Sequence, residues 1–186
     1  MKVKEIICAA AGLLGKANVA AYLSSDNASA GTGVVAEVNS AVRLLNVLLC
    51  EIAGSYLPMI KKETPIVKNG KIYYEDLTED VIRIREVLDA NGEPEFFVIH
   101  TEYVTPRSEL SAVVYEYIPA AYGLTDEIGT FDKPVSVAVL AYGLAAEICL
   151  SEGRYKESVV WRERFSDGLS AVVLPKCGRA KSRCFI

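Results

Sequence analysis

With 186 residues, the chain is long enough for one domain with a sizeable core. Hydrophobic residues make up 51% and charged residues 24%, which excludes a disordered chain, and a net charge of −4 gives no sign of a surface for nucleic acid. The charge is unevenly spread. The last eleven residues carry four positive charges and no acid. Because the whole chain has a net charge of −4, residues 1–175 must have a net charge of about −8.

The five cysteines favour a reducing compartment. They are odd in number, follow no tight repeating spacing, and three of them lie in apolar stretches where a thiol behaves as a small hydrophobe. The sequence also contains no run of about 18 uncharged apolar residues, so we expect no membrane span. The cysteines are Cys8, Cys50, Cys149, Cys177 and Cys184.

The first part of the chain predicts helices. Residues 3–14 indicate one helix, and a short helical piece follows and extends through Leu23. Residues 24–33 are small and polar, which is typical of a loop. Apolar residues at helical spacing then predict a long helix over residues 34–56, which Pro58 ends.

The middle of the chain changes to strand patterns. Asn69-Gly70, between two short apolar runs within residues 64–74, predicts a hairpin. Residues 81–88 alternate with a period of two, and after a turn at Asn91-Gly92 we expect residues 96–99 to return along that strand.

A further strand is expected over residues 111–118, ending at Pro119. Residues 60–118 therefore predict a small antiparallel β insertion. The helices around it, in residues 1–59 and 119–175, form a bundle, so the fold class is α+β: mainly a helical bundle with an inserted small antiparallel β subdomain.

Two more helices close the bundle. Pro134 suits the first turn of a helix over residues 135–150. This helix is apolar nearly all round, so we expect neighbours on more than one side, at the middle of the bundle. The last helix, residues 154–173, places Trp161 and Phe165 on one face and ends before Pro175.

No set of residues predicts catalysis. His100 is the only histidine and closes a predicted strand, so it lacks a partner for metal binding. Cys177 and Cys184 would still need two further ligands for a zinc site. We therefore expect no catalytic residues, no metal and no cofactor.

Two other patterns have ordinary explanations. Gly12, Gly15 and Lys16 resemble part of a phosphate-binding loop, but Ala10 and Ala17 stand where its glycine and hydroxyl residue belong. Pairs of carboxylates occur in polar turns, where general acid–base chemistry lacks the desolvation it needs. These pairs are Glu75-Asp76, Glu79-Asp80 and Asp126-Glu127.

The order of several motifs resembles the head-to-tail connector (adaptor or neck) proteins of tailed bacteriophages. In that family a helical bundle is interrupted by a β subdomain, a Tyr-x-Tyr-x-Pro strand leads into the closing helices, and a C-terminal arm projects outward. The resemblance covers about residues 35–173. The motifs are Tyr56-Leu57-Pro58, Tyr115-Glu116-Tyr117-Ile118-Pro119, Thr125-Asp126-Glu127, the run Ala141 to Glu147, and Glu152-Gly153-Arg154-Tyr155.

The resemblance implies a structural virion protein and not an enzyme. It implies a homo-oligomeric ring, commonly of twelve copies, that joins the portal protein to tail or neck proteins, in the neck of a virion made in the host cytoplasm. DNA would pass through the ring without sequence-specific binding. The acidic excess of residues 1–175 suits such a channel, because a negative lumen would not hold phosphates.

The C-terminal segment, residues 176–186, is interpreted as an extended basic arm that docks on the portal. It combines four cations with an apolar end, and the residues expected to bind the partner are Lys176, Arg179, Lys181, Arg183, Phe185 and Ile186. The alternative interpretation is a small bacterial ligand-binding module or enzyme. It would have a pocket between the bundle and the β region, with His100 and a nearby carboxylate as its active groups.

Overall fold

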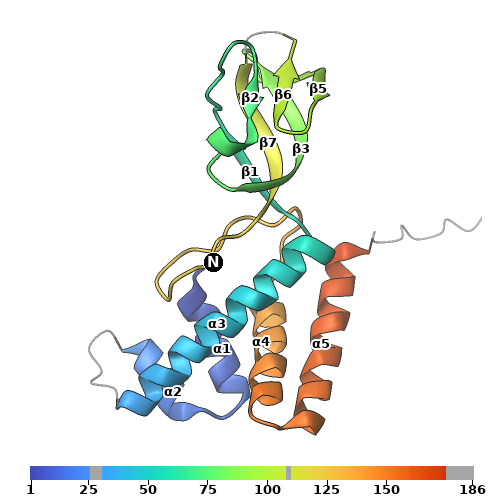
Figure 1. Ribbon diagram of the computed structural model, residues 1–186. Coiled ribbons are helices and arrows are strands. Elements are labelled where there is room, and N and C mark those ends of the chain that lie inside the picture. Colours follow the sequence, from blue (N-terminus) through green and yellow to red (C-terminus); the bar gives the residue numbers. More distant parts are fainter. Residues whose placement is uncertain (26–30, 108–109, 175–186) are drawn as a thin grey trace, which may run out of the picture.

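A computed structural model describes residues 1–25, 31–107 and 110–174, and it confirms the α+β class. Helices form one part of the molecule and antiparallel strands form the other, which projects from the helices (Figure 1). The helical part consists of α1 (Val3–Leu13), α2 (Ala17–Ser24), α3 (Thr32–Ser55), α4 (Val137–Ser151) and α5 (Tyr155–Val173).

The helix α4 lies at the middle of the helical part, as the sequence predicts, and packs against α1, α3 and α5. It begins at Val137, two residues later than expected, because the Ser136 hydroxyl accepts a hydrogen bond from the Val139 amide and caps the first turn. Its apolar residues are covered on several sides, which is why nearly the whole helix is apolar. Its buried residues are Leu140, Ala141, Gly143, Leu144, Ala145, Ala146, Ile148 and Cys149.

The helix α3 is long and apolar enough to cross a membrane by length and composition alone. A core helix of a folded domain meets the same criterion. Here α3 buries a stripe of residues at helical spacing against the bundle, with Leu45, Leu49 and Ile52 almost fully inaccessible to solvent.

The β part contains two antiparallel sheets. One has the order β1-β7-β3-β4 and the other β2-β6-β5. The strand β1 begins at Met59, one residue ahead of the expected insertion. The strands are β1 (Met59–Glu63), β2 (Ile72–Tyr73), β3 (Asp80–Asp89), β4 (Pro94–Glu95), β5 (Phe97–Ile99), β6 (Tyr103–Pro106) and β7 (Leu110–Ile118), with a short 3-10 helix η1 (Tyr74–Asp76).

The hairpin expected over residues 64–74 is only partly correct. The turn exists, with Asn69 and Gly70 at positive φ of 53° and 71° and a single bridge from Lys68 to Lys71. The run before the turn forms no strand, and β2 pairs instead with β6, a strand that the sequence pattern does not predict. A good local turn therefore does not fix which strands pair.

The strand β3 forms as expected, but the prediction that its side chains alternate strictly between two faces is wrong. Its pairing with β7 shifts between Val81 and Arg83 and again between Ile84 and Glu86. These irregularities place Ile84 and Val87 on one buried face with Tyr115 and Val113, although they are three residues apart.

The expected return of residues 96–99 along β3 is also wrong. Only β4, at Pro94–Glu95, pairs with the end of β3. The chain then passes to the second sheet, where β5 pairs with β6. The Asn91-Gly92 turn is present, and the Asp89 carboxylate accepts the amide of Asn91 at 2.8 Å.

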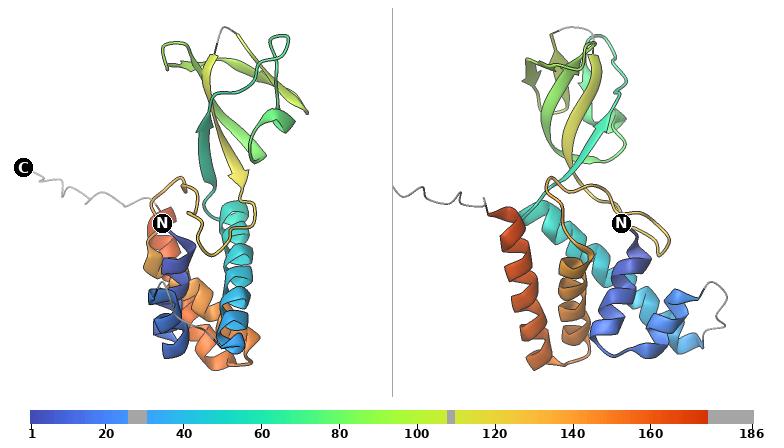
Figure 2. Two further views of the ribbon diagram at one scale, coloured as in Figure 1. Left: turned by 90° about the vertical axis from the view of Figure 1, so that its left-hand side faces the viewer. Right: turned by 180° about the vertical axis from the view of Figure 1, so that it is seen from behind.

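The two parts meet at a narrow junction that the chain crosses twice, through the start of β1 and the end of β7 (Figure 2). The loop after β7 contacts both parts at this junction. The Asp132 amide donates to the Pro58 carbonyl at 2.9 Å, and Phe131 forms an isolated antiparallel β-bridge with Met59. The same loop holds the first residues of the chain. The Val3 amide donates to the Asp126 carbonyl, and the Ile128 amide donates to the Met1 carbonyl.

Candidate functional site

A concave surface lies between α3 and α5 and forms a groove with a volume of about 320 Å³. Both helices pack on α4, which forms the floor. The walls are mostly apolar, and serines of α5 lie along one side. The lining residues are Leu48, Glu51, Tyr56, Gly143, Ala146, Glu147, Arg162, Phe165, Ser166, Leu169, Ser170, Val173 and Leu174.

Two glycines allow α4 to pack closely on α3 and α5. A Cβ atom on Gly143 of α4 would lie 2.8 Å from the Leu48 side chain and 2.9 Å from the Phe165 ring. A Cβ on Gly168 of α5 would lie 2.7 Å from Val139. The helices therefore approach closely at these positions, and Gly143 itself lines the α3–α5 groove (the groove between α3 and α5).

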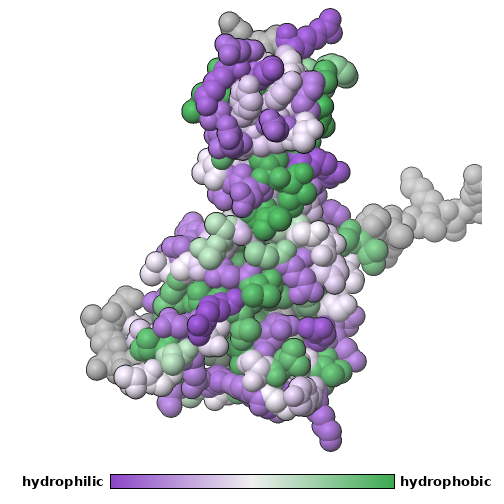
Figure 3. Space-filling model, in the orientation of Figure 1, coloured by the Kyte–Doolittle hydropathy of each residue, from purple (hydrophilic) through white to green (hydrophobic). Residues whose placement is uncertain are grey.

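The rim of the α3–α5 groove carries charge. Glu51 is exposed on α3, and no ion pair of Glu51 occurs within the described residues. Across the groove, Arg162 of α5 donates to Glu147 of α4 at 2.8 Å. Apolar and polar side chains lie close together over this face of the helical part (Figure 3).

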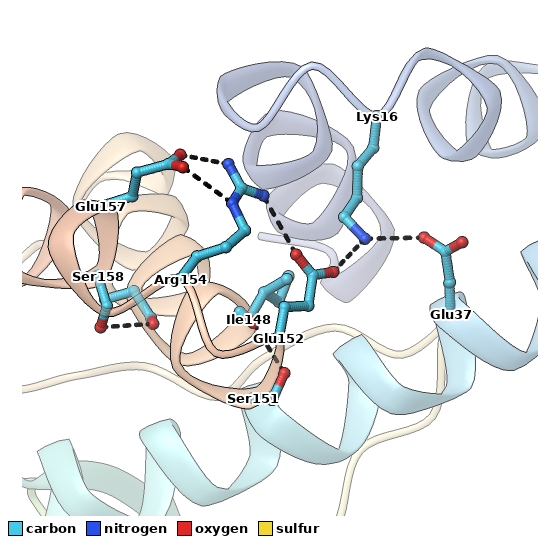
Figure 4. Close-up of polar contacts among 9 residues, drawn as sticks. Lys16, Glu37, Ile148, Ser151, Glu152, Arg154, Glu157 and Ser158 are labelled. Atoms are coloured by element: carbon cyan, nitrogen blue, oxygen red, sulfur yellow. Dashed lines mark hydrogen bonds and ion pairs between the residues drawn. The ribbon is translucent and has the colours of Figure 1, made fainter.

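At the opposite end of the helices, a chain of ion pairs ties α1–α2, α3, α4 and α5 together (Figure 4). The Lys16 ammonium donates to Glu37 at 2.9 Å and to Glu152 at 2.5 Å. Arg154 also donates to Glu152, at 3.1 Å, and pairs with Glu157. The hydrogen bond from Lys16 lowers the pKa of the Glu152 carboxyl below its ordinary value, against the opposing effect of burial.

Lys16 is thus a structural cation, and its role was not evident from the sequence. Gly15 precedes it at a positive φ of 69°, which turns the chain between α1 and α2. The glycine and the lysine that faintly resemble a phosphate loop therefore form a helix-to-helix turn, with the lysine directed at two carboxylates.

A second polar cluster lies at the base of the β part. Glu116 is buried and accepts hydrogen bonds from Arg83 and Arg85, both at 2.6 Å. Arg85 also binds Asp132 of the loop after β7, at 2.8 Å and 3.0 Å. Burial alone would raise the pKa of Glu116, but the two guanidinium groups outweigh it and the pKa lies below its ordinary value.

A shallower pocket does lie at the junction of the two parts, where the alternative interpretation expects an active site. Its lining includes Lys61, Glu79, Tyr117, Tyr122 and Glu127 but not His100. Lys61 and Glu79 pair with each other at 3.0 Å.

His100 lies elsewhere, directly after β5, in the other sheet. Its ring stacks on Tyr103 with the centroids 4.4 Å apart, its amide donates to the Tyr103 carbonyl, and its own carbonyl accepts the Tyr74 hydroxyl. These contacts are those of a residue that closes a strand. The structure does not bring His100 into the junction pocket.

The predicted carboxylate pairs serve turns and ion pairs. Asp126 accepts the Gly123 amide at 2.7 Å, and Asp76 accepts from Lys68 at 2.6 Å. One oxygen of Asp76 is buried without a hydrogen-bond partner among the described residues, which departs from the expectation of a fully solvated turn.

The predicted docking arm lies outside the described residues, as do Cys177 and Cys184. Within residues 1–25, 31–107 and 110–174, no group of three or more metal-ligating side chains occurs. The α3–α5 groove was not found from the sequence, because its lining comes from three helices that are separate in the chain. The small residues of α4 and α5 were its only signal.

Comparison of the sequence with protein-family models gives no match. Comparison with curated proteins gives no match either.

Proposed function

We propose that this chain is a structural virion protein, a ring-forming head-to-tail adaptor that joins the portal to the tail of a bacteriophage and leaves a channel for DNA. The observation that carries the proposal is the architecture. A helical part is interrupted between α3 and α4 by a projecting β part, and the Tyr115–Pro119 strand leads back into the closing helices. This is the arrangement that the resemblance of the motifs implies.

The surface of α5 supports assembly into an oligomer. This helix packs mainly on α4, and its buried residues are only Ser158 and Leu169. Tyr155, Val159 and Val160 are large apolar residues that remain about half exposed or more. Apolar side chains gathered on one exposed helix are typical of a surface that another subunit covers.

The projecting β part supports contact with a second kind of partner. Phe96, directly before β5, is 73% exposed, and Ile99, at the end of β5, is 59% exposed. Figure 1 shows β5 in the part of the β region that lies far from the helices. A subunit with two separated contact regions suits a role between two neighbours, one on each side of a ring.

The test is to mix the purified chain with portal rings and to examine the particles by electron microscopy and native mass. We expect a ring of this chain on one end of the portal. Val160→Asp should prevent the ring without changing the melting temperature, and Ala171→Asp, which adds the same charge at an exposed small residue of α5, should not. A chain that stays monomeric and does not bind the portal would contradict the proposal.

A further inference from the structure

We propose that the α3–α5 groove of one copy binds the C-terminal segment, residues 175–186, of a neighbouring copy. This inference rests on the proposed function, because it names the contact that links successive subunits of the ring. It also assigns the basic segment to a cleft on this chain, in place of one on the portal.

The dimensions fit. The lining residues along α5 run from Arg162 to Leu174, the residue directly after the helix, which at about 1.5 Å per residue is a length of about 18 Å. Residues 175–186 span up to about 40 Å when extended. One segment can therefore cross the whole groove and still bridge the space between two subunits.

The chemistry is complementary. The groove has apolar walls formed by Leu48, Phe165 and Leu169, and carboxylates at Glu51 and Glu147 on its rim. The segment carries four cations and no acid, and it ends in an apolar pair. Its apolar end suits the walls, and its cations suit Glu51, which no cation of the described residues engages.

The position of Leu174 favours the segment of a neighbour over the chain's own. Leu174 lines one end of the groove and has extended dihedral angles, φ −67° and ψ 135°. The next residue is Pro175, which favours an extended residue before it. To enter its own groove, the segment would have to reverse at once and run back along α5. A neighbour's segment needs no reversal.

The symmetry of this contact also agrees with a ring. The segment of one copy enters the groove of the next, so the two surfaces in contact are different. A contact between different surfaces builds a ring when the rotation that repeats it closes, whereas a contact between identical surfaces stops at a dimer.

Disulfide trapping in the full-length protein tests the proposal. Ser166→Cys places a thiol in the groove, and Cys184 supplies the thiol of the segment. The background carries Cys50→Ser, which removes the exposed helical thiol, and Cys177→Ser, which removes the other thiol of the segment. After mild oxidation, we expect a ladder of covalently linked chains on a non-reducing gel. The ladder should vanish when Cys184→Ser is added, and Ala171→Cys, exposed outside the groove, should not produce it.

A blocked groove gives the second measurement. Ser170→Trp fills the groove from an exposed position and should reduce the ladder to the level of the Cys184→Ser control, while Ala171→Trp on the neighbouring residue should leave it intact. Glu51→Lys should weaken the ladder, and Glu163→Lys, outside the groove, should not.

Other outcomes would overturn the proposal. A linked monomer of increased mobility would mean that the segment occupies its own groove. If Ala171→Cys gave as much disulfide linking as Ser166→Cys, the linking would come from random collisions between chains and not from docking in the groove. No linking, with rings that still form on the portal and are unaffected by Ser170→Trp, would refute this contact and leave the adaptor function standing.

Discussion

The helical part and the β part are stabilised in different ways. In the helical part, α4 is covered by three other helices, and its Leu140 and Leu144 are completely buried. In the β part, polar groups take part in the interior: the Tyr115 hydroxyl donates to Glu63 at 3.0 Å, and the Glu116 carboxylate accepts from two arginines.

This difference indicates which changes each part tolerates. An apolar core loses stability in proportion to the surface and volume that a substitution disturbs. A small sheet with buried polar groups depends on each hydrogen-bond partner, because a buried group left unpaired costs the full energy of its desolvation. Burial and the neighbouring Glu63 both raise the pKa of Tyr115, so this hydroxyl stays protonated as a donor.

The largest effect is expected from Leu144→Asp. The substitution places a carboxylate without a partner in the centre of the helical part, at a cost of at least about 3 kcal/mol in the free energy of unfolding. Val47→Asp on α3, at a position 66% exposed, is the matched control. Thermal unfolding followed by circular dichroism measures both, and equal melting temperatures for the two variants would contradict the assigned core.

Glu116→Ala should cost about 2 kcal/mol and act on the β part, because it removes the shared acceptor of Arg83 and Arg85. Glu86→Ala, on the exposed side of the same sheet, should cost much less. Hydrogen exchange separates the parts: amides of β3 and β7 should lose protection while those of α4 keep theirs. Equal loss of amide protection in both parts would contradict the separate stabilisation of the helical part and the β part.

The pH dependence of stability gives a second measurement on Glu116. Its pKa in the folded state lies below the ordinary value of 4.5, so its contribution is complete above that value and is lost as the pH falls through the folded pKa. Stability of the wild type should therefore fall on acidification below about pH 4.5 more steeply than that of Glu116→Gln. Parallel curves would contradict the role of this carboxylate.

Gly129→Ala tests the junction between the two parts. An added Cβ would collide with the Tyr117 hydroxyl, and Tyr117 is a buried, rigid side chain, so we expect a loss of about 1–3 kcal/mol. Gly54→Ala in α3 has open space around the new methyl group and should be neutral or stabilise by up to about 1 kcal/mol. Chemical denaturation of the pair measures the difference, and similar values would argue against a tight junction.

The smallest effect is expected from Lys16→Gln, which removes the cation between Glu37 and Glu152. These groups are partly exposed, so the loss should stay below about 1 kcal/mol and shrink further at high salt. Lys62→Gln, on β1, is a control at a lysine outside this network. A loss of several kcal/mol would mean that ion pairs, and not the apolar core, hold the helices together.

The helices were predictable from the sequence to within about two residues, because helical spacing is a local signal and Pro58 and Ser136 mark boundaries. The sheets were not. Pairing of β2 with β6 joins segments about 30 residues apart, and nothing local to Ile72 specifies it. The irregular register of β3 likewise depends on Tyr115 and Val113, which lie on another strand.

The candidate site was harder still to predict. The α3–α5 groove arises where Leu48, Gly143 and Phe165 meet, and each looks ordinary within its own helix. The ion pairs of Lys16 reach Glu152, which is 136 positions further along the chain. Such contacts follow from the packing of whole helices, which a one-dimensional pattern does not encode.

The hydrogen bonds between the first residues and the loop after β7 have a consequence for biosynthesis. Met1 and Val3 bind residues of the 126–128 loop, and α1 packs on α4 as well as on α2 and α3, so the N-terminal helices lack this loop and α4 until residues 126–151 have left the ribosome. The β part, whose strand pairings lie within residues 59–118, can form earlier. The nascent chain therefore carries an apolar α1 and α3 through much of synthesis, and a chaperone that shields apolar helices would act in that interval.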